Sequence, residues 1–104
     1  MIATTPAPPY YAVIFTSLRT SVAEGYAETA ARMMALAAEQ PGFLGVESAR
    51  EKVGITVSYW RNLESIRNWK RVEEHLAAQD KGRRTWYEAY SVRIALVERD
   101  YSIG

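Results

Sequence analysis

The residues with the clearest chemical potential lie in one stretch of the C-terminal half of the chain. Six of the twelve aromatic residues lie between Tyr59 and Tyr90, and the single histidine, His75, lies among them. Aromatic rings can stack on a flat ligand, and an imidazole with an ordinary pKa near ~6.5 can relay a proton. The stretch therefore predicts an aromatic-lined site served by His75. The alternative is a half-exposed helical histidine bonded to Glu74 or to a neighbouring strand.

The tryptophans and tyrosines of this stretch each allow two interpretations. Trp60 and Trp69 either line a pocket or fill the space between a helix and a sheet, because pocket walls and core walls are often the same residues. Strict alternation along the last strand places Tyr87 and Tyr90 on opposite faces, so only one of them can face a helix-covered cavity. Three arginines either hold an anionic group or are simply solvated, namely Arg83, Arg84 and Arg93.

The composition excludes several classes of site. The absence of cysteine excludes disulfides, thiol nucleophiles and zinc–thiolate centres, and a single histidine excludes a multi-histidine metal site within one chain. The sequence has no phosphate loop, no G-x-S-x-G or HExxH motif, and no flavin or nicotinamide fingerprint. We therefore expect a protein that uses no metal and no cofactor.

The charge and hydropathy also restrict the partners. A formal net charge of +1 argues against nucleic acid, which calls for a basic face or stripe. No apolar run approaches the ~18–20 residues of a membrane span. Residues 1–9 lack the pattern of a secretory signal and read as a short flexible lead-in, so we expect a cytoplasmic protein without a membrane partner.

The first three elements follow from local patterns. Residues 10–18 are rich in aromatic and β-branched side chains, which is typical of a strand. Residues 21–40 predict an amphipathic helix that begins with a capping box at Ser21–Glu24. Pro41–Gly42 ends this helix, since proline cannot donate a backbone hydrogen bond and glycine permits a positive φ. Residues 43–50 then predict a second strand.

The last three elements repeat this order. Residues 55–60 alternate as a half-buried strand does, and the turn at 51–54 contains a glycine that can supply the unusual φ. Asn62 is a plausible N-cap of a second helix, which ends near Gly82. Residues 85–97 predict a final strand whose two faces are both largely apolar, so we expect both faces to be covered.

The order strand, helix, strand, strand, helix, strand predicts one α+β domain over residues 10–104. It is the ferredoxin-like βαββαβ arrangement, with two helices on one face of a four-stranded antiparallel sheet. The other face would carry many apolar groups that nothing in the chain covers. We therefore expect a homodimer in which two sheets pack face to face as a dimeric α+β barrel.

Several short motifs follow one another in a characteristic order, which is residues 58–69 (SYWRNLESIRNW), His75, Gly82, Trp86–Tyr87 and Tyr90. In this order and spacing the chain resembles the antibiotic biosynthesis monooxygenase domain, over about residues 10–101. The segment Pro41–Gly45 is also similar to that family's link from first helix to second strand. The resemblance implies the dimeric barrel already expected from the uncovered face.

The resemblance also implies a reaction. Some family members oxidise aromatic substrates with O2 and without metal or flavin, because the substrate's own carbanion reduces oxygen. Trp60 matches the tryptophan of that group, while Ile66 and Thr56 stand where it has tyrosine and asparagine. We therefore predict a cofactor-independent monooxygenase acting on a small aromatic or quinol-like compound. The predicted catalytic residues are His75, Trp69 and Arg83, and the predicted substrate-binding residues are Trp60, Tyr59, Trp86 and Tyr90.

Three other functions stay open. The first is a non-catalytic barrel that binds a small molecule or serves in a stress response. The second is haem binding and degradation, for which Trp69 matches the family's ring-distorting tryptophan, although Gln79 stands at the position of its ligating histidine. The third is an RRM-like RNA binder, which would need Phe15 and Tyr59 on an open basic sheet.

Overall fold

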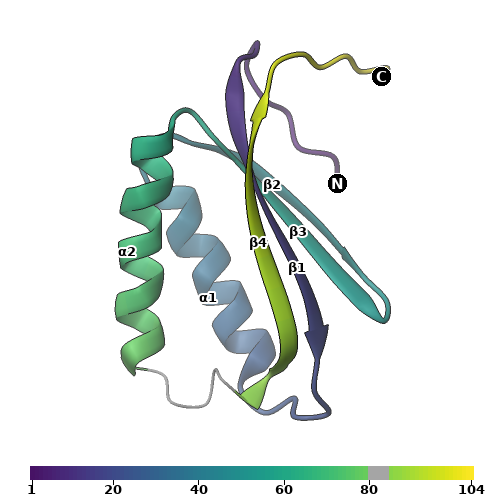
Figure 1. Ribbon diagram of the computed structural model, residues 1–104, viewed down its shortest axis with the longest axis vertical. Helices are drawn as coiled ribbons and strands as arrows, with labels where there is room; N and C mark the ends of the chain where they lie inside the picture. The colour runs from purple at the N-terminus through teal and green to yellow at the C-terminus, as the bar shows by residue number, and fades with distance from the viewer. Residues whose placement is uncertain (80–84) are drawn as a thin grey trace.

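The computed structural model describes residues 1–79 and 85–104, with the side chains of residues 77–79 left out of the description. The elements are β1 (Tyr10–Arg19), α1 (Tyr26–Glu39), β2 (Phe43–Arg50), β3 (Val53–Trp60), α2 (Leu63–Gln79) and β4 (Tyr87–Val97). The strands form one antiparallel sheet in the order β2-β3-β1-β4. Both helices lie on one side of it (Figure 1). This confirms the predicted ferredoxin-like arrangement.

Helix α1 begins at Tyr26, five residues after Ser21, where the predicted capping box begins. Its N-cap is Gly25, which has a φ of 77° and provides no side-chain cap, so the prediction of a box at Ser21–Glu24 is wrong. The reason is that the preceding backbone is tied to the start of β4. The Thr20 N–H donates to the Trp86 carbonyl at 2.9 Å, which holds the chain extended where the box would need a helical turn.

The hairpin between β2 and β3 also differs from the prediction. Gly54 lies inside β3 and has no positive φ, so it does not make the turn, which falls at Glu51 and Lys52. Gly54 is instead a site of close approach. A Cβ built on it would lie 2.0 Å from an Nη of Arg50, its partner across the hairpin. The absent side chain leaves the space in which the Arg50 guanidinium lies.

The junction between α1 and α2 agrees with the sequence prediction. Gly42 has a φ of 86°, and a Cβ on it would lie 2.0 Å from the Ser65 Oγ. Asn62 caps α2, since its Oδ1 accepts the Ser65 N–H at 2.8 Å and the Ser65 hydroxyl at 2.8 Å. The Arg61 N–H also donates to the Gly42 carbonyl at 2.8 Å. These bonds fix the start of α2 against the end of α1.

The registers of the three strand pairs define which side chains face the helices. Tyr11 and Val13 of β1 pack against the helix-side core, and directly opposed residues of antiparallel strands share a face. On the helix-facing side, opposed residues form four rows, and each row crosses the sheet in the order β2, β3, β1, β4. The rows are Phe43, Trp60, Tyr11, Leu96; Val46, Ser58, Val13, Ile94; Ser48, Thr56, Phe15, Val92; and Arg50, Gly54, Ser17, Tyr90. The helix-facing side thus changes from apolar to polar along the strands.

The opposite face of the sheet carries no helix, and the two termini cover one end of it. Glu47 accepts the Ala3 N–H at 2.9 Å and the Tyr59 hydroxyl at 2.5 Å. Tyr10 donates its hydroxyl to the Asp100 carboxylate, and its ring meets the Tyr59 ring edge-on at 5.8 Å. The other end of this face stays open. Strand β4, predicted to be covered on both faces, is exposed along nearly its whole length in the single chain.

Candidate functional site

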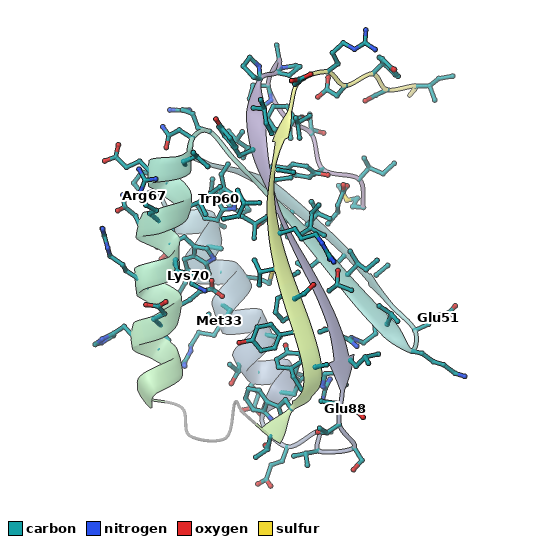
Figure 2. The ribbon with its side chains drawn as sticks, viewed as in Figure 1. Met33, Glu51, Trp60, Arg67, Lys70 and Glu88 are labelled. Carbon is teal, nitrogen blue, oxygen red and sulfur yellow. The ribbon has the colours of Figure 1, made fainter. Side chains whose placement is uncertain are left out.

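One group of aromatic residues forms the closed part of the helix side, and we call Phe43, Trp60 and Trp69 the tryptophan core. The rings of Trp60 and Trp69 stack with centroids 6.1 Å apart and planes 22° apart, and Phe43 meets Trp60 edge-on at 5.4 Å. Trp60 is fully buried between the helices and the sheet (Figure 2). Its Nε1 donates to the Ser58 Oγ at 2.9 Å. The surfaces of the two tryptophans are therefore used by the fold itself.

A second group lies farther along the sheet, and we call Phe15, Tyr26, Trp86, Tyr87 and Tyr90 the aromatic cluster. The Phe15 ring lies 5.5 Å from Tyr87 and 5.4 Å from Tyr90. The Tyr26 ring, at the start of α1, lies 6.0 Å from Tyr87 and 5.7 Å from Trp86. Three segments far apart in the sequence thus supply one continuous aromatic surface.

A bulge in β4 creates this surface. Leu18 pairs with Ala89, but the next residue of β1, Arg19, pairs with Tyr87, so Glu88 is left out of the register. An extra residue in one strand shifts its alternation by one position. Tyr87 therefore lies on the same face as Tyr90, and their ring centroids are 6.0 Å apart. The prediction that these two tyrosines face opposite sides is wrong for this reason.

The aromatic cluster and the adjoining part of β4 stay open. Tyr90 is 64% exposed, although its ring contacts Phe15 and Tyr87. The other helix-facing residues of β4 retain about half of their exposure, which is 44% for Val92, 53% for Ile94 and 48% for Leu96. An apolar surface that faces a helix layer and yet remains exposed can accept a flat apolar ligand.

Trp86 closes the end of this cluster. It is buried, and its Nε1 donates to the Glu24 carbonyl at 2.8 Å. Arg19 donates from Nε to the Trp86 carbonyl at 3.1 Å, and its Cζ lies 3.3 Å above the Tyr26 ring. A cation over an aromatic face is stabilising, and more so where it is partly desolvated. Trp86 and Arg19 thus fix the loop before α1 against the start of β4.

The remaining predicted site residues do not lie with this cluster. Tyr59 is on the helix-free face, where burial and the hydrogen bond to Glu47 raise its pKa to about 12. His75 is exposed on α2 and interacts with a neighbouring group there. Arg83, predicted to be catalytic, and Arg84 lie outside the described residues. The predicted site residues therefore fall into two separate groups. Trp60 and Trp69 belong to the tryptophan core, and Trp86 and Tyr90 belong to the aromatic cluster.

Sequence reasoning missed Phe15, Tyr26 and Arg19 as members of the site. No motif marks them, because their proximity to Tyr90 depends on the strand register and on the bulge in β4. The single local signal was the aromatic ending around Tyr87 and Tyr90, which was recognised, but its partners come from the first strand and first helix.

The described part of the chain holds neither a metal-binding cluster nor a membrane-spanning helix. Residues 1–79 and 85–104 contain no group of three or more histidine, cysteine, aspartate or glutamate residues arranged to hold a metal ion. Neither helix, as far as it is described, combines the length and the apolar character needed to cross a bilayer.

Comparison with known proteins gives consistent results. Residues 9–81 match the family model described as antibiotic biosynthesis monooxygenase. The chain is 59% identical over 97 residues to the Bacillus subtilis (strain 168) protein named "Uncharacterized protein YqjZ", covering 91% of this chain and 85% of that one.

Two solved structures share the fold at low sequence identity. SnoaB, a cofactor-independent oxygenase from Streptomyces nogalater, is similar with a TM-score of 0.73 at 14% identity, over 89% of this chain and 97% of SnoaB. A putative antibiotic biosynthesis monooxygenase from Bacillus cereus is similar with a TM-score of 0.62 at 15% identity, over 92% of this chain and all of the other.

Proposed function

Because the chain belongs to the antibiotic biosynthesis monooxygenase family, we propose that it is a cofactor-independent monooxygenase that acts with O2 on a small aromatic or quinol-like compound. One observation carries the proposal. The aromatic cluster offers an exposed ring, Tyr90, backed by Phe15 and Tyr87 on the helix side of the sheet. The surface for a flat substrate is therefore the aromatic cluster rather than the tryptophan core.

The reaction borrows its reactivity from the substrate. A ring-activated CH2 group loses a proton, and the resulting carbanion reduces O2. The CH2 carbon becomes C=O, one oxygen atom enters the product, and the other leaves as water with the two hydrogens of the CH2. The protein holds the ring on Phe15 and Tyr90 and excludes water from one face of it. His75 is exposed on α2 outside the aromatic cluster, and its role in the proposal is to relay the released proton rather than to take it directly from the ring.

Oxygen uptake tests this function. The wild-type protein is mixed with a panel of anthrones and hydroquinones, and O2 consumption is compared with the amount of quinone formed. We expect one O2 per product, a lower kcat/KM for Tyr90→Ala, and a lower kcat with little change in KM for His75→Gln. Arg67→Gln, an exposed change on α2, is the control and leaves both constants unaltered. Substrate binding without O2 consumption would contradict a catalytic function.

A non-catalytic binding protein is the second candidate, and a specific observation favours it. The position at which the oxygenase group has a tyrosine is occupied by Ile66, which is 6% exposed and packs into the core beside Trp60 and Trp69. That position therefore offers no hydroxyl to a substrate. A binding protein predicts a higher Tm with a saturating aromatic ligand, with no product and no O2 consumed.

We also propose that the protein is a homodimer that pairs through its helix-free faces. Leu18, Val53 and Ile55 lie on the open end of that face and are 39%, 46% and 45% exposed. Leu18 and Val53 also border a shallow hollow of about 350 Å³, whose other lining residues are Thr16, Ser17, Ala89, Tyr90 and Ser91. A second copy of the same face would cover this apolar surface, and a two-fold axis permits that pairing.

The oligomeric state tests the dimer. Analytical ultracentrifugation is expected to give twice the chain mass for the wild type and one chain mass for Ile55→Lys, because a buried unpaired ammonium is costly at an apolar interface. Lys70→Glu, on the exposed side of α2, is the control and should sediment as the wild type. A wild-type protein that sediments as a monomer at all concentrations would contradict the dimer.

A further inference from the structure

The last row of the helix-facing side brings an arginine close to the aromatic cluster. In this row Ser17 lies directly opposite Gly54 on β3 and directly opposite Tyr90 on β4. On the other side of Gly54, Arg50 of β2 lies directly opposite it. Because neighbouring strands are ~4.8 Å apart, Gly54 and Tyr90 lie about 10 Å apart across Ser17. A guanidinium above Gly54 and a phenol ring on Tyr90 thus flank one buried serine.

Two features hold the Arg50 guanidinium in this place. An Nη of Arg50 donates to the Oγ of Ser17, which is 2% exposed, and the other Nη lies 3.5 Å from the Ser17 carbonyl. Gly54 has no side chain, and a Cβ there would lie 2.0 Å from Nη2 and 2.1 Å from Cζ of Arg50. The glycine that does not make the hairpin turn therefore makes room for the cation. An arginine held in advance loses less conformational entropy when it binds.

The guanidinium also retains free donors. Arg50 is exposed, and its hydrogen bonds are the two to Ser17, so within the described residues no carboxylate neutralises it. Arginine has five N–H donors in a planar fork that matches a carboxylate. Arg19, another described arginine of this end, is instead engaged by two backbone carbonyls and by the face of Tyr26. Of these two described arginines, Arg50 is thus the one with capacity for an anion.

We propose that Arg50 is the specificity-determining residue of the site and that the ligand is an aromatic carboxylate. Its ring system lies on Phe15 and Tyr90, and its carboxylate reaches along the row over Ser17 to the Arg50 guanidinium. The inference rests on the proposed function, because it takes the aromatic cluster as the surface that receives the ring. It adds the charge of the ligand and the residue that recognises that charge.

Binding of a matched pair of probes tests this assignment. We use 2-naphthoate and 2-naphthamide, which share ring and shape but differ in charge, and measure Kd by titration calorimetry on the full chain. The wild type is expected to bind the carboxylate about tenfold more tightly than the amide, since charge-assisted bidentate hydrogen bonds are the stronger ones. Raising the salt concentration should reduce this preference, because the site is open to solvent.

Three variants separate the role of Arg50 from general effects. Arg50→Gln removes the charge and is expected to abolish the tenfold preference while leaving the amide Kd within twofold. Gly54→Ala keeps the charge but displaces the guanidinium, and it should reduce the preference to a similar extent. Arg67→Gln, which lowers the net charge equally but lies on α2, should keep the full preference.

The outcomes distinguish the two proposals. If both probes bind with equal affinity and Arg50→Gln changes neither Kd, the assignment of Arg50 is wrong while the aromatic surface stands. If Arg67→Gln weakens carboxylate binding as much as Arg50→Gln does, the effect is one of net charge and the assignment is again wrong. If neither probe binds, the aromatic surface is not a ligand site, and both proposals fall.

Discussion

The tryptophan core and the aromatic cluster use the same residue types on the same face of one sheet, yet they differ in what surrounds them. Trp60 is fully buried against Trp69 and Phe43, whereas Tyr90 is 64% exposed although two aromatic rings contact it. The cause lies in the rows of the sheet. The row that contains Trp60 is apolar throughout, while the row that contains Tyr90 also contains Arg50, Gly54 and Ser17.

Aromatic content alone therefore does not locate a binding surface. Trp60 and Trp69 are buried in the core between the helices and the sheet, which stabilises the fold. The tyrosines and Phe15 sit where the sheet becomes polar, so their rings remain available beside a cation. The comparison predicts that the two groups respond in opposite ways to substitution, with stability lost at one and binding lost at the other.

The largest effect is expected from Trp60→Ala. Removing a fully buried indole leaves a cavity and typically costs about 3–5 kcal/mol, a large share of the stability of a small domain. Urea denaturation measures it, and the variant should be largely unfolded or close to it. Tyr90→Ala is the matched aromatic control and should cost under about 1 kcal/mol, because most of its ring is already in water. Equal losses of unfolding free energy at both positions would contradict the difference between the tryptophan core and the aromatic cluster.

The next effect is expected from Gly42→Ala, at the junction that holds α2 against the core. Alanine at a φ of 86° is strained, and its Cβ would meet the Ser65 Oγ at 2.0 Å. We expect a loss of about 2–3 kcal/mol in the free energy of unfolding, measured by urea denaturation. Gly45→Ala is a milder control, since a Cβ there meets Ala3 at 3.2 Å and the φ is not positive. A Gly42→Ala variant as stable as the wild type would show that the junction accepts a side chain at this position without strain.

A smaller effect on stability, but a clear one on binding, is expected from Phe15→Leu. Leucine keeps much of the apolar volume at this half-buried position, so the free energy of unfolding should fall by about 1 kcal/mol. The ring contacts with Tyr87 and Tyr90 disappear, however, and the Kd for 2-naphthoate should rise severalfold. Phe43→Leu in the tryptophan core should do the reverse, with the larger loss of stability and an unchanged Kd.

The smallest effect concerns pH and the helix-free face. The Tyr59 hydroxyl and then the Ala3 N–H lower the pKa of Glu47 below its ordinary value of 4.5. A carboxylate with a depressed pKa stabilises the fold above its unfolded pKa, and this contribution is lost as the pH falls through the folded pKa. Between about pH 7 and pH 3, Tm should therefore fall less for Glu47→Gln than for the wild type.

Two comparisons make this pH prediction specific. Glu51→Gln, at the exposed tip of the hairpin (Figure 2), should follow the wild type, because Glu51 lies outside the hydrogen bonds that join Glu47 to Tyr59 and Ala3. Asp100 and the N-terminal ammonium also face this network, so the change of Tm with pH is compared as the difference between each variant and the wild type. Identical slopes for Glu47→Gln and the wild type would show that the tie between Glu47 and the N-terminal segment does not contribute.

Much of the fold could be predicted from the sequence, because its signals are local. The alternation of residues 55–60, the Pro41–Gly42 stop and the Asn62 cap each depend on neighbours within a few residues, and the structure confirms them. The two errors, at Ser21–Glu24 and at Gly54, have different causes. At Ser21–Glu24 a distant residue, Trp86, holds the backbone through the hydrogen bond from Thr20. At Gly54 the turn falls two residues earlier, at Glu51 and Lys52, and the glycine instead leaves space for the Arg50 side chain.

The candidate site was less predictable, because its signals are not local. The family resemblance directed attention to Trp60 and Trp69, and the aromatic ending directed it to Tyr90. Which of these is open to a ligand depends on burial. The position of Tyr87 depends on a bulge that leaves Glu88 out of register, and no periodicity of the last strand indicates that bulge. Phe15 and Tyr26 join the cluster only through the tertiary fold.

The most direct test of the difference between the two groups is a titration with 2-naphthoate followed by NMR of the tryptophan indole N–H groups. The three indoles report on the two regions separately, since Trp60 and Trp69 belong to the tryptophan core and Trp86 belongs to the aromatic cluster. We predict that the Nε1–H signal of Trp86 shifts progressively with ligand while those of Trp60 and Trp69 stay in place. A saturable shift confined to Trp60 and Trp69, with Trp86 unmoved, would contradict this account.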